Sequence, residues 1–591
     1  MKPHITLALL VWLSIGIISG QAQSTLTYTR LGQALAKPEQ VIRLDLSKQQ
    51  LKELPDELKK LKNLEYLDIS HHHFQAFPEV IFTLKKLRVL KINAKYGWNS
   101  KIHKVPTQIA QLRQLRYLDI SELPLHEEPK AIYQLKNLEV LIMHDIIPVV
   151  DLNKAPRKPN TGGFRSSMVG AYSLTLQGIK NLKKLKELDI SSHTWRMKTL
   201  PDEVTQLPHL ERLNISENWY AALPTQITNL KKLRHLNLGH TVNYLKNAPQ
   251  NFEFLGQLKL ATLDLKYAND PASLLNLLLY PQWVRSLNLS SCRLKKLPES
   301  LLRFTQLREL NLEDNKLVDL PQNISKLGQL EALNISNNAF EKLPGSITKL
   351  ARLSTLECFR EFLCSPEKNL VLPKHLGKLK KLEVLNLTGN IITSFPASFG
   401  QMTQLRRLSI YGITVDAFMA AQLAQLTQLE YLEMTLGEKT KLPNAFRNLA
   451  RLKTLSVSAM YCEGVPVSNG MSAFPIVICD LPALEKLALV GHDIKALPPQ
   501  IKKLKRLKVL NLYDNALVTL PDELGELSAL TQLYVDLYCI GFRYQVCQKP
   551  LILPASLCKL KHLKTLKYGE RKIDPTSLRR IQQCLQLEDQ D

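Results

Sequence analysis

The chain contains little glycine, few cysteines and none of the short motifs that mark common enzyme sites. It has 23 glycines and nine cysteines in 591 residues. No G-x-x-x-x-G-K-[ST] loop, H-E-x-x-H helix or C-x-x-C pair occurs, so no nucleotide-dependent, zinc-dependent or dithiol enzyme is indicated. No apolar stretch of about 20 residues follows residue 18, so we expect no transmembrane segment in the mature chain.

Residues 1–22 have the features of a secretion signal. A short basic start is followed by an apolar run at 5–18, and Gly20 and Ala22 are small residues at the −3 and −1 positions of a cleavage site. A run of about 14 residues is short for a membrane span. We therefore expect a secreted or periplasmic protein, with an uncleaved anchor as the alternative.

The net charge is +25. Its lysines recur in the pattern Leu-Lys-Lys-Leu, at residues 58–61, 84–87, 230–233 and 379–382. A charge that returns at regular intervals is typical of the solvated side of a series of short helices, and we expect no nucleic-acid partner. Attraction to anionic lipid, lipopolysaccharide or an acidic polymer stays open as the alternative.

One segment of about 23 residues is repeated along nearly the whole chain. Its clearest copy, Leu330 to Pro344, matches the pattern L-x-x-L-x-L-x-x-N-x-L, with Asn338 at the asparagine position. Other copies have asparagine or cysteine there: Asn218, Cys292, Asn315, Asn390 and Asn515. The second framework leucine of each segment falls at residues 44, 67, 90, 118, 141, 188, 213, 236, 263, 287, 310, 333, 356, 385, 408, 432, 455, 487, 510, 533 and 566.

The apolar spacing within a segment predicts a strand followed by a short helix. Leucine and isoleucine alternate with asparagine in 333–335, as in a half-buried strand. Asn338 then turns the chain, and its amide can satisfy backbone groups left unpaired by the turn. Ile347 and Leu350 follow at helical spacing, and Pro344 suits the first helical position.

Stacked segments bury one another's leucines. Parallel strands lie about 4.8 Å apart, whereas helices need more room. The array must therefore bend, with parallel strands on its concave face and short helices on its convex face. The predicted fold class is an α/β solenoid with the shape of a horseshoe.

The 23-residue segment, with Leu-Pro before its helical half, resembles the leucine-rich repeats of plant intracellular Ras-group and LAP-type scaffold proteins. It is also similar to the repeats of bacterial secreted leucine-rich-repeat proteins. The resemblance covers about residues 26–587. It implies a leucine-rich-repeat solenoid with a protein-binding role and no cofactor. It implies no particular partner, because each family member recognises its partner through its variable positions.

Both ends of the array have sequences suited to polar caps. Tyr28 to Ala36 predicts an amphipathic helix, and Asp574-Pro575 predicts the start of another. The repeats leave no room for a separate catalytic domain, which indicates a protein that is not an enzyme. The predicted organisation is a signal peptide at 1–22, an N-terminal cap helix at 23–41, the array of about 21 repeats at 42–568, and a C-terminal cap helix with a tail at 569–591.

Several repeats contain inserts after the strand, which should project from one edge of the array. Inserts on one face of a solenoid are often binding elements. The longest, residues 144–177, is interpreted as a loop, with a degenerate repeat whose strand lies near Phe164 to Met168 as the alternative.

Four cysteines in or beside the inserts are disulfide candidates in an oxidising compartment, as the pairs Cys462–Cys479 and Cys539–Cys547. The alternative is that they are small buried residues, and the sequence does not determine their connectivity.

Acidic and amide side chains form a column beside the framework leucines: Asp45, Asp68, Asp119, Asp189, Asn214, Asn237, Asp264, Asn288, Asn311, Asn334 and Asn386. Such residues also occur in acid–base and calcium sites, but a polar ladder on an exposed sheet is the favoured interpretation. His71, His72 and His73 are consecutive, and consecutive residues rarely converge on one ion. We therefore predict no metal site.

Outward-facing aromatic and arginine side chains are enriched where interfaces concentrate their energy. Tyr66 and Tyr117 lie near the start of the array, and a larger group lies in its C-terminal third. The candidate partner-binding residues are Phe359, Arg407, Tyr411, Tyr431, Glu433, Tyr513 and Tyr534. Scattered exposed tyrosines without a common role are the alternative.

The sequence therefore predicts a secreted or periplasmic scaffold that binds an unidentified protein through its concave face and edge inserts. A binder of glycan or of an anionic envelope polymer is one alternative. An intracellular signalling scaffold is another, and it requires that residues 1–22 are not a signal peptide.

Overall fold

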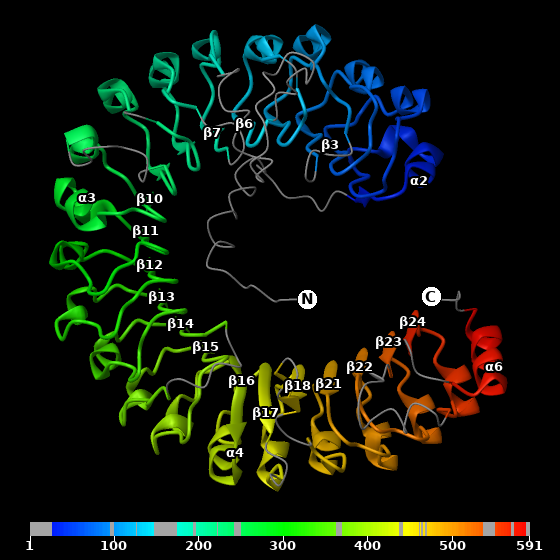
Figure 1. Ribbon diagram of the computed structural model, residues 1–591. Helices are drawn as coiled ribbons and strands as arrows, with labels where there is room; N and C mark the ends of the chain where they lie inside the picture. Colours follow the sequence, from blue (N-terminus) through cyan, green and yellow to red (C-terminus); the bar gives the residue numbers. More distant parts are fainter. Residues whose placement is uncertain are drawn as a thin grey trace, which may run out of the picture. The chain divides into compact units, whose positions relative to one another are not determined.

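The computed structural model describes residues 26–94, 100–125, 127–146, 174–192, 197–220, 223–241, 250–361, 369–436, 441–459, 461–462, 465–466, 470–535, 550–568 and 573–586 (Figure 1). The chain divides into two compact units. The first unit contains the residues up to Arg293 and Pro298–Leu307, and the second contains Leu294–Leu297 and the residues from Arg308 onward.

Both units are built from short parallel strands that pair in the order of the sequence. Framework leucine lies opposite framework leucine, for example Leu44 opposite Leu67 in the first unit and Leu510 opposite Leu533 in the second. Within each unit the strands lie on the inner side of the bend and the short helices on the outer side (Figure 1). The predicted α/β repeat solenoid is confirmed.

The strands of the first unit are β1 (Thr27–Tyr28), β2 (Arg43–Asp45), β3 (Tyr66–Asp68), β4 (Val89–Lys91), β5 (Tyr117–Asp119), β6 (Val140–Ile142), β7 (Glu187–Asp189), β8 (Arg212–Asn214), β9 (His235–Asn237), β10 (Thr262–Asp264) and β11 (Ser286–Asn288). The parallel strands of the second unit are β12 (Glu309–Asn311), β13 (Ala332–Asn334), β14 (Thr355–Glu357), β15 (Val384–Asn386), β16 (Arg407–Val415), β17 (Tyr431–Leu436), β18 (Thr454–Ser458), β21 (Lys486–Val490), β22 (Val509–Asn511), β23 (Gln532–Tyr534) and β24 (Thr565–Lys567).

Most of the helices are single turns of 3-10 helix. In the first unit these are η2 (Pro38–Gln40), η3 (Asp56–Lys60), η4 (Glu79–Thr83), η5 (Thr107–Gln111), η6 (Lys130–Gln134), η7 (Ile179–Asn181), η8 (Asp202–Gln206), η9 (Thr225–Asn229), η11 (Gln250–Gln257), η12 (Pro281–Trp283) and η13 (Glu299–Arg303). In the second unit they are η14 (Ile324–Lys326), η15 (Gly345–Lys349), η16 (Leu376–Lys378), η17 (Phe399–Gln401), η18 (Asn444–Asn448), η19 (Ile476–Asp480), η20 (Pro499–Lys503), η21 (Asp522–Glu526) and η23 (Ala555–Lys559). The α-helices are α2 (Leu31–Ala36), α3 (Pro271–Leu277), α4 (Ala417–Leu423) and α6 (Pro575–Leu585).

The sequence predicted that proline occupies the first position of the helical turn. In the structure proline stands one residue before the turn. Pro344 is the N-cap of η15, and its carbonyl accepts the N–H of Ile347 at 3.1 Å. The i→i+3 bond defines a 3-10 turn, and the fixed φ of proline holds its carbonyl in place. A 23-residue repeat has room for little more than this turn.

In several repeats a polar side chain joins the turn to the preceding repeat, and half-buried Asn338 is one example. Asn338 donates from Nδ2 to the Leu312 carbonyl at 2.9 Å, and its Oδ1 accepts the N–H of Leu317 at 2.9 Å. Both partners belong to the repeat before it. The asparagine of the sequence pattern therefore satisfies backbone groups that the turn leaves without a partner.

Other residue types occupy this position in other repeats. His492 accepts the N–H of Met471 through Nδ1 at 3.2 Å, and its Nε2 lies 3.1 Å from the Val457 carbonyl. Cys292 points its sulfur at the Leu265 carbonyl, 3.3 Å away. Polar residues of more than one type at this position therefore reach the preceding repeat. In other repeats the position is apolar and buried, as at Leu123, Ile146, Ala268 and Ile413.

The residue before this position has a left-handed backbone in many repeats. Its φ is +58° at Glu122, +55° at Asp314 and +76° at Gly389. The N–H of Asp314 donates to the Ser336 carbonyl of the next repeat at 3.0 Å. A left-handed conformation costs a non-glycine residue about 1 kcal/mol, and these ladder bonds hold it in place. The array can therefore turn at each repeat although glycine is scarce.

The caps differ in detail from the sequence prediction. Tyr28 lies in β1, which pairs with β2, so the N-terminal helix α2 begins only at Leu31. At the other end Asp574 caps α6 by accepting the N–H of Ser577 at 2.7 Å, as its position before Pro575 predicted. Among the described residues no helix is long and apolar enough to cross a bilayer.

The longest insert follows β6, which pairs with β7 so that Leu141 lies opposite Leu188. Most of residues 144–177, including the alternative strand near Phe164 to Met168, lies outside the described residues, so both interpretations of this insert stay predictions. In the second unit the insert after β18 forms a small antiparallel hairpin of β19 (Tyr461–Cys462) and β20 (Val465–Pro466).

Replacement of Asn218 by alanine is expected to lower the free energy of unfolding by about 2–3 kcal/mol, because it leaves buried backbone groups unpaired. Asn218 is fully buried, donates to the Ile190 carbonyl at 3.0 Å and accepts the Met197 N–H at 2.9 Å. Urea denaturation measures the change. The control is Asn229→Ala at the exposed end of η9. A loss of less than about 0.5 kcal/mol for Asn218→Ala would contradict the role assigned to this position.

Candidate binding surface

The parallel sheet of the second unit is widest at strands β16, β17, β18 and β21. These strands contain nine, six, five and five residues, whereas β15 and β22 contain three. An irregularity after Ile410 lets β16 pair with β17 again at Thr414, and between them the N–H of Gly412 donates to Thr435 Oγ1 at 2.9 Å. The strands therefore present longer columns of side chains at the place where Arg407, Tyr411, Tyr431 and Glu433 lie.

Arg407, Tyr431 and Glu433 form one contact network, which we call the second-unit triplet. Arg407 and Tyr431 are directly opposite in the β16–β17 pairing, and the guanidinium carbon lies 4.4 Å from the centroid of the tyrosine ring. The Tyr431 hydroxyl donates to Glu433 Oε2 at 3.1 Å. Burial and the charge of Glu433 raise the pKa of Tyr431 to about 12, so its hydroxyl remains a donor at neutral pH.

A buried carboxyl group lies on the same sheet, and sequence analysis missed it. Glu357 of β14 is only 7% exposed. The pKa of Glu357 is raised to about 7, mainly by burial and to a smaller extent by the charge of Glu313. A hydrogen bond from Asn386 and the charge of Arg407 act in the opposite direction. Glu357 occupies the position that asparagine or aspartate has in most earlier repeats. That substitution was the available signal in the sequence.

The other predicted site residues surround the triplet less closely. Tyr411 follows Arg407 on β16, and burial and the charge of Glu433 raise its pKa. Phe359 lies in the turn after β14, where its N–H bonds the Ser336 hydroxyl at 3.1 Å. Both are half-buried on the strand side.

Tyr513 and Tyr534 belong to neighbouring repeats but not to the same row of the sheet. Tyr534 pairs with Asn511, so Tyr513 lies two residues further along the chain, in the turn after β22. The Asn511 Oδ1 accepts the N–H of Tyr513 at 2.9 Å. The Tyr534 hydroxyl donates to Gln532 of its own strand at 3.3 Å. The structure thus joins three of the seven predicted residues in one network and leaves the others around it.

The prediction of a Cys462–Cys479 disulfide is corrected by the structure. Cys479 is a free, buried thiol in η19, and burial raises its pKa to about 12. It lies on the buried side of the short helix beside Val477 and Ile478. Cys539 and Cys547 lie outside the described residues.

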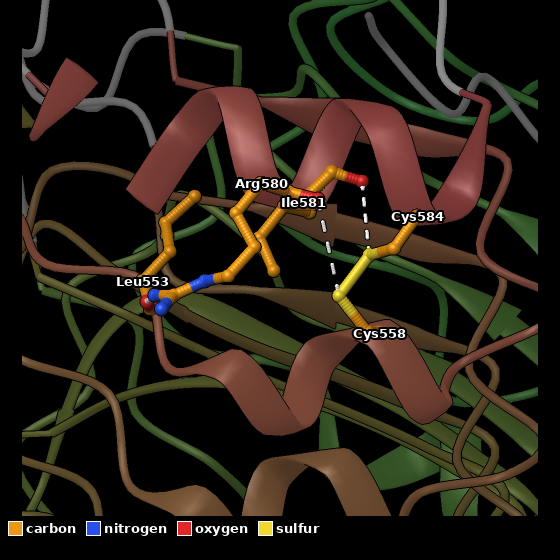
Figure 2. The surroundings of a disulfide bond; sticks show 5 residues. All are labelled: Leu553, Cys558, Arg580, Ile581 and Cys584. Atoms are coloured by element: carbon orange, nitrogen blue, oxygen red, sulfur yellow. Dashed lines mark hydrogen bonds between the residues drawn. A yellow bond between two sulfur atoms is a disulfide. The ribbon is translucent and has the colours of Figure 1, made fainter. Parts of the chain in front are cut away.

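A disulfide joins Cys558 of η23 to Cys584 of α6 (Figure 2). It attaches the C-terminal cap to the last repeat, and Arg580 of the same helix donates to the Leu553 carbonyl at 3.2 Å. The cap is therefore held by a covalent bond and by hydrogen bonds to the backbone of the last repeat.

The polar column and the histidine run have structural roles. Asp68 Oδ1 accepts hydrogen bonds from the N–H of Ser70 at 3.0 Å and from the Ser70 hydroxyl at 2.6 Å. These bonds close the turn after β3. His72 is buried and accepts the N–H of Leu51 at 2.9 Å, in the place of the repeat asparagine. Within the described ranges no group of three or more histidine, cysteine or acidic side chains is arranged to hold a metal ion.

Comparisons with protein families match the repeats of the second unit and the junction before it. A family described as "Leucine-rich repeat region" matches residues 365–491, and one described as "Leucine rich repeat" matches residues 284–340 and 305–357. A curated relative, the mouse (Mus musculus) volume-regulated anion channel subunit LRRC8B, is 28% identical over 184 residues. That match covers 27% of this chain and 23% of the channel subunit, so it spans less than a quarter of the relative's length.

Solved structures match over almost the whole chain. The TLR13–ssRNA13 complex is similar with a TM-score of 0.59 and 20% identity, over 95% of this chain and 86% of that one. A leucine-rich-repeat protein of Leptospira interrogans has 23% identity over 96% of this chain and 99% of that one, with a TM-score of 0.31.

The parallel strands in leucine register, the short outer helices and the similarity to the TLR13–ssRNA13 structure define a leucine-rich-repeat solenoid. Residues 284–357 and 365–491 match leucine-rich-repeat families, and the described repeats on either side have the same fold.

The free energy of unfolding should fall as the pH rises from about 4.5 through 7, because native Glu357 holds its proton more tightly than in the unfolded chain. Glu357→Gln removes the free-energy cost of ionising this buried carboxyl group. It is expected to be more stable than the original chain by about 3 kcal/mol at pH 8 and similar to it near pH 4. Urea denaturation across this range measures the difference. Glu309→Gln, a half-buried residue of β12, is the control. An equal pH dependence in both variants would contradict the assignment to Glu357.

Proposed function

We propose that this protein is a non-enzymatic scaffold that binds another protein through the strand side of its second unit. The observation behind this proposal is the second-unit triplet, a stacked Arg407–Tyr431 pair fixed by Glu433 where the strands lengthen. Arginine and tyrosine are the side chains most enriched in interface hot spots. A pair held in place before binding loses less conformational entropy when a partner arrives.

The side chains favour a protein partner over a nucleic acid. TLR13 was solved with ssRNA13, so this fold alone does not decide the class of ligand. Nucleic-acid binding depends on many lysines and arginines that neutralise phosphates. The strand side around the triplet instead combines Arg407 and the exposed Lys486 with two acidic residues, Glu357 and Glu433, and with neutral residues such as Ser409 and Ser456. This balance supports recognition of a mixed polar and aromatic protein surface.

An anionic envelope polymer or glycan is a second candidate ligand, and it would use the helix side. Lys59 and Lys60 of η3 are exposed there, in the Leu-Lys-Lys-Leu pattern that recurs along the chain. Such binding would be electrostatic and would weaken steeply as salt is added. Binding at the triplet would depend less on salt, because its side chains are half-buried.

Combined replacement of Arg407 and Tyr431 by alanine is expected to weaken binding of the native protein partner at least tenfold, which is the usual effect of removing an interface hot spot. The full chain and the variant would each be cross-linked in cells or envelopes that contain the natural partner, and captured proteins quantified at two salt concentrations. Arg406→Ala is the matched control, since Arg406 lies beside the triplet in an ion pair with Glu430. Equal capture by all three chains would contradict the proposed surface.

We further infer that the protein acts in a secreted or periplasmic location. The signal-like residues 1–22 and the Cys558–Cys584 bond support this, because structural disulfides persist in oxidising compartments.

The native protein, isolated with its thiols blocked at the moment of lysis, is expected to contain the Cys558–Cys584 bond. Cys292, Cys358 and Cys479 are expected to be modified only after unfolding, since they are buried and burial raises their pKa values to about 12. Peptide mass spectrometry measures both. Free Cys558 and Cys584 thiols in the native protein would contradict the location.

A further inference from the structure

The first unit contains the same three-residue arrangement as the second-unit triplet. The guanidinium carbon of Arg43 lies 4.0 Å from the centroid of the Tyr66 ring, and the Tyr66 hydroxyl lies 3.4 Å from Asp68 Oδ2. Burial and the charge of Asp68 raise the pKa of Tyr66 to about 12, so this hydroxyl also remains a donor. We call Arg43, Tyr66 and Asp68 the first-unit triplet.

The two triplets occupy the same positions of the repeat. Arg43 is opposite Tyr66 in the β2–β3 pairing, as Arg407 is opposite Tyr431 in the β16–β17 pairing. In both, the acidic residue lies two positions after the tyrosine on the same strand. Equal register in a parallel sheet places the three side chains in the same geometry. Among the described residues each unit therefore has one copy of this arrangement.

Among the described residues neither stacked arginine forms an ion pair within 4 Å, although the charge of Arg407 is near enough to Glu357 to lower the pKa of that carboxyl group. The stacked arginines differ in this respect from arginines that immediately precede a strand. Those arginines form ion pairs: Arg88 with Glu65, Arg116 with Glu139, Arg308 with Glu331 and Arg406 with Glu430. An arginine whose guanidinium carbon lies about 4 Å from a tyrosine ring centroid, and which forms no ion pair, has N–H groups that can donate to a ligand. Those groups match a carboxylate, which they bind in a paired arrangement.

The neighbouring acid limits which anion can bind. Asp68 and Glu433 would repel a ligand that is negative throughout, such as a dense polyanion. In the first unit Lys91 offsets this charge, with its Nζ 3.7 Å from Asp68 and 5.8 Å from the centroids of Tyr66 and Tyr117. In the second unit the residue opposite Glu433 is the neutral Ser456. A carboxylate accompanied by an N–H donor satisfies both the arginine and the acid of a triplet.

We propose that the two triplets are equivalent docking points for carboxylate-bearing segments of a polypeptide, one in each unit. The ligand group is an aspartate or glutamate side chain, or a chain terminus, beside a backbone N–H. The arginine binds the carboxylate, the tyrosine holds the arginine, and the acid fixes the tyrosine and accepts the ligand's N–H. This inference rests on the proposed function of the second-unit triplet and extends it to a second site and a defined chemical group.

The test uses the full chain and peptides selected on it from a random display library. Peptides that also bind the double variant Arg43→Gln/Arg407→Gln are removed. The remaining peptides are expected to contain aspartate, glutamate or a free C-terminus. Calorimetry should give two sites per chain, with one site weakened about tenfold to a hundredfold in each single variant, since a hydrogen bond to a charged group contributes about 1.5–3 kcal/mol.

Arg88→Gln and Arg406→Gln are the matched controls, because they remove neighbouring arginines that already have acidic partners. Both controls should keep two sites, and both single variants should remain folded by circular dichroism. One site that only Arg407→Gln removes would overturn the twin-site inference and leave the proposed function standing. One site that only Arg43→Gln removes would overturn both. Selection of peptides without acidic groups, or equal losses in the controls, would overturn the carboxylate assignment.

Discussion

The fixed register of leucine against leucine is the constraint on which the rest of the structure depends. A strand turns alternate side chains to opposite faces, so once Leu408 lies opposite Leu432 the residues on either side of it must face outward. Arg407 and Tyr431 are then neighbours whatever partner exists. Slippage by one residue would bury the arginine and expose the leucine. The core therefore determines both the stability of the array and the geometry of its surface.

The regular part of the fold could be predicted because every repeat contains the same information. Errors occurred where local geometry outweighed the pattern. Apolar spacing at Ile347 suggested an ordinary helix, but the short repeat and Pro344 produce a single 3-10 turn. Tyr28 was assigned to a helix because it precedes one, yet the open edge of β2 recruits it as a strand. The β19–β20 hairpin depends on contacts within an insert that shares no pattern with the repeats.

The candidate site was predictable in its members and not in its contacts. Arg407, Tyr431 and Glu433 were identified because outward positions follow from the leucine register. Their stacking depends on side-chain conformations, which a sequence pattern does not specify. Glu357 was missed because an acidic residue in a polar column looks ordinary, and only the burial in the folded sheet changes its protonation. Cys479 was misassigned for a related reason, since the pattern did not show that its thiol faces the core.

A feature can recur in a repeat protein because the fold needs it or because a ligand needs it. The two triplets illustrate the second case. Features that support folding, such as the polar residue represented by Asn338 and His492, return in many repeats, where they bond backbone groups of the preceding repeat. Arginine stacked on tyrosine occurs at two places among the described residues, and intervening repeats pair their strands without it. The fold therefore does not require this arrangement. Two copies in equal register, each with an arginine that forms no ion pair among the described residues, are better explained by a ligand group that both units bind.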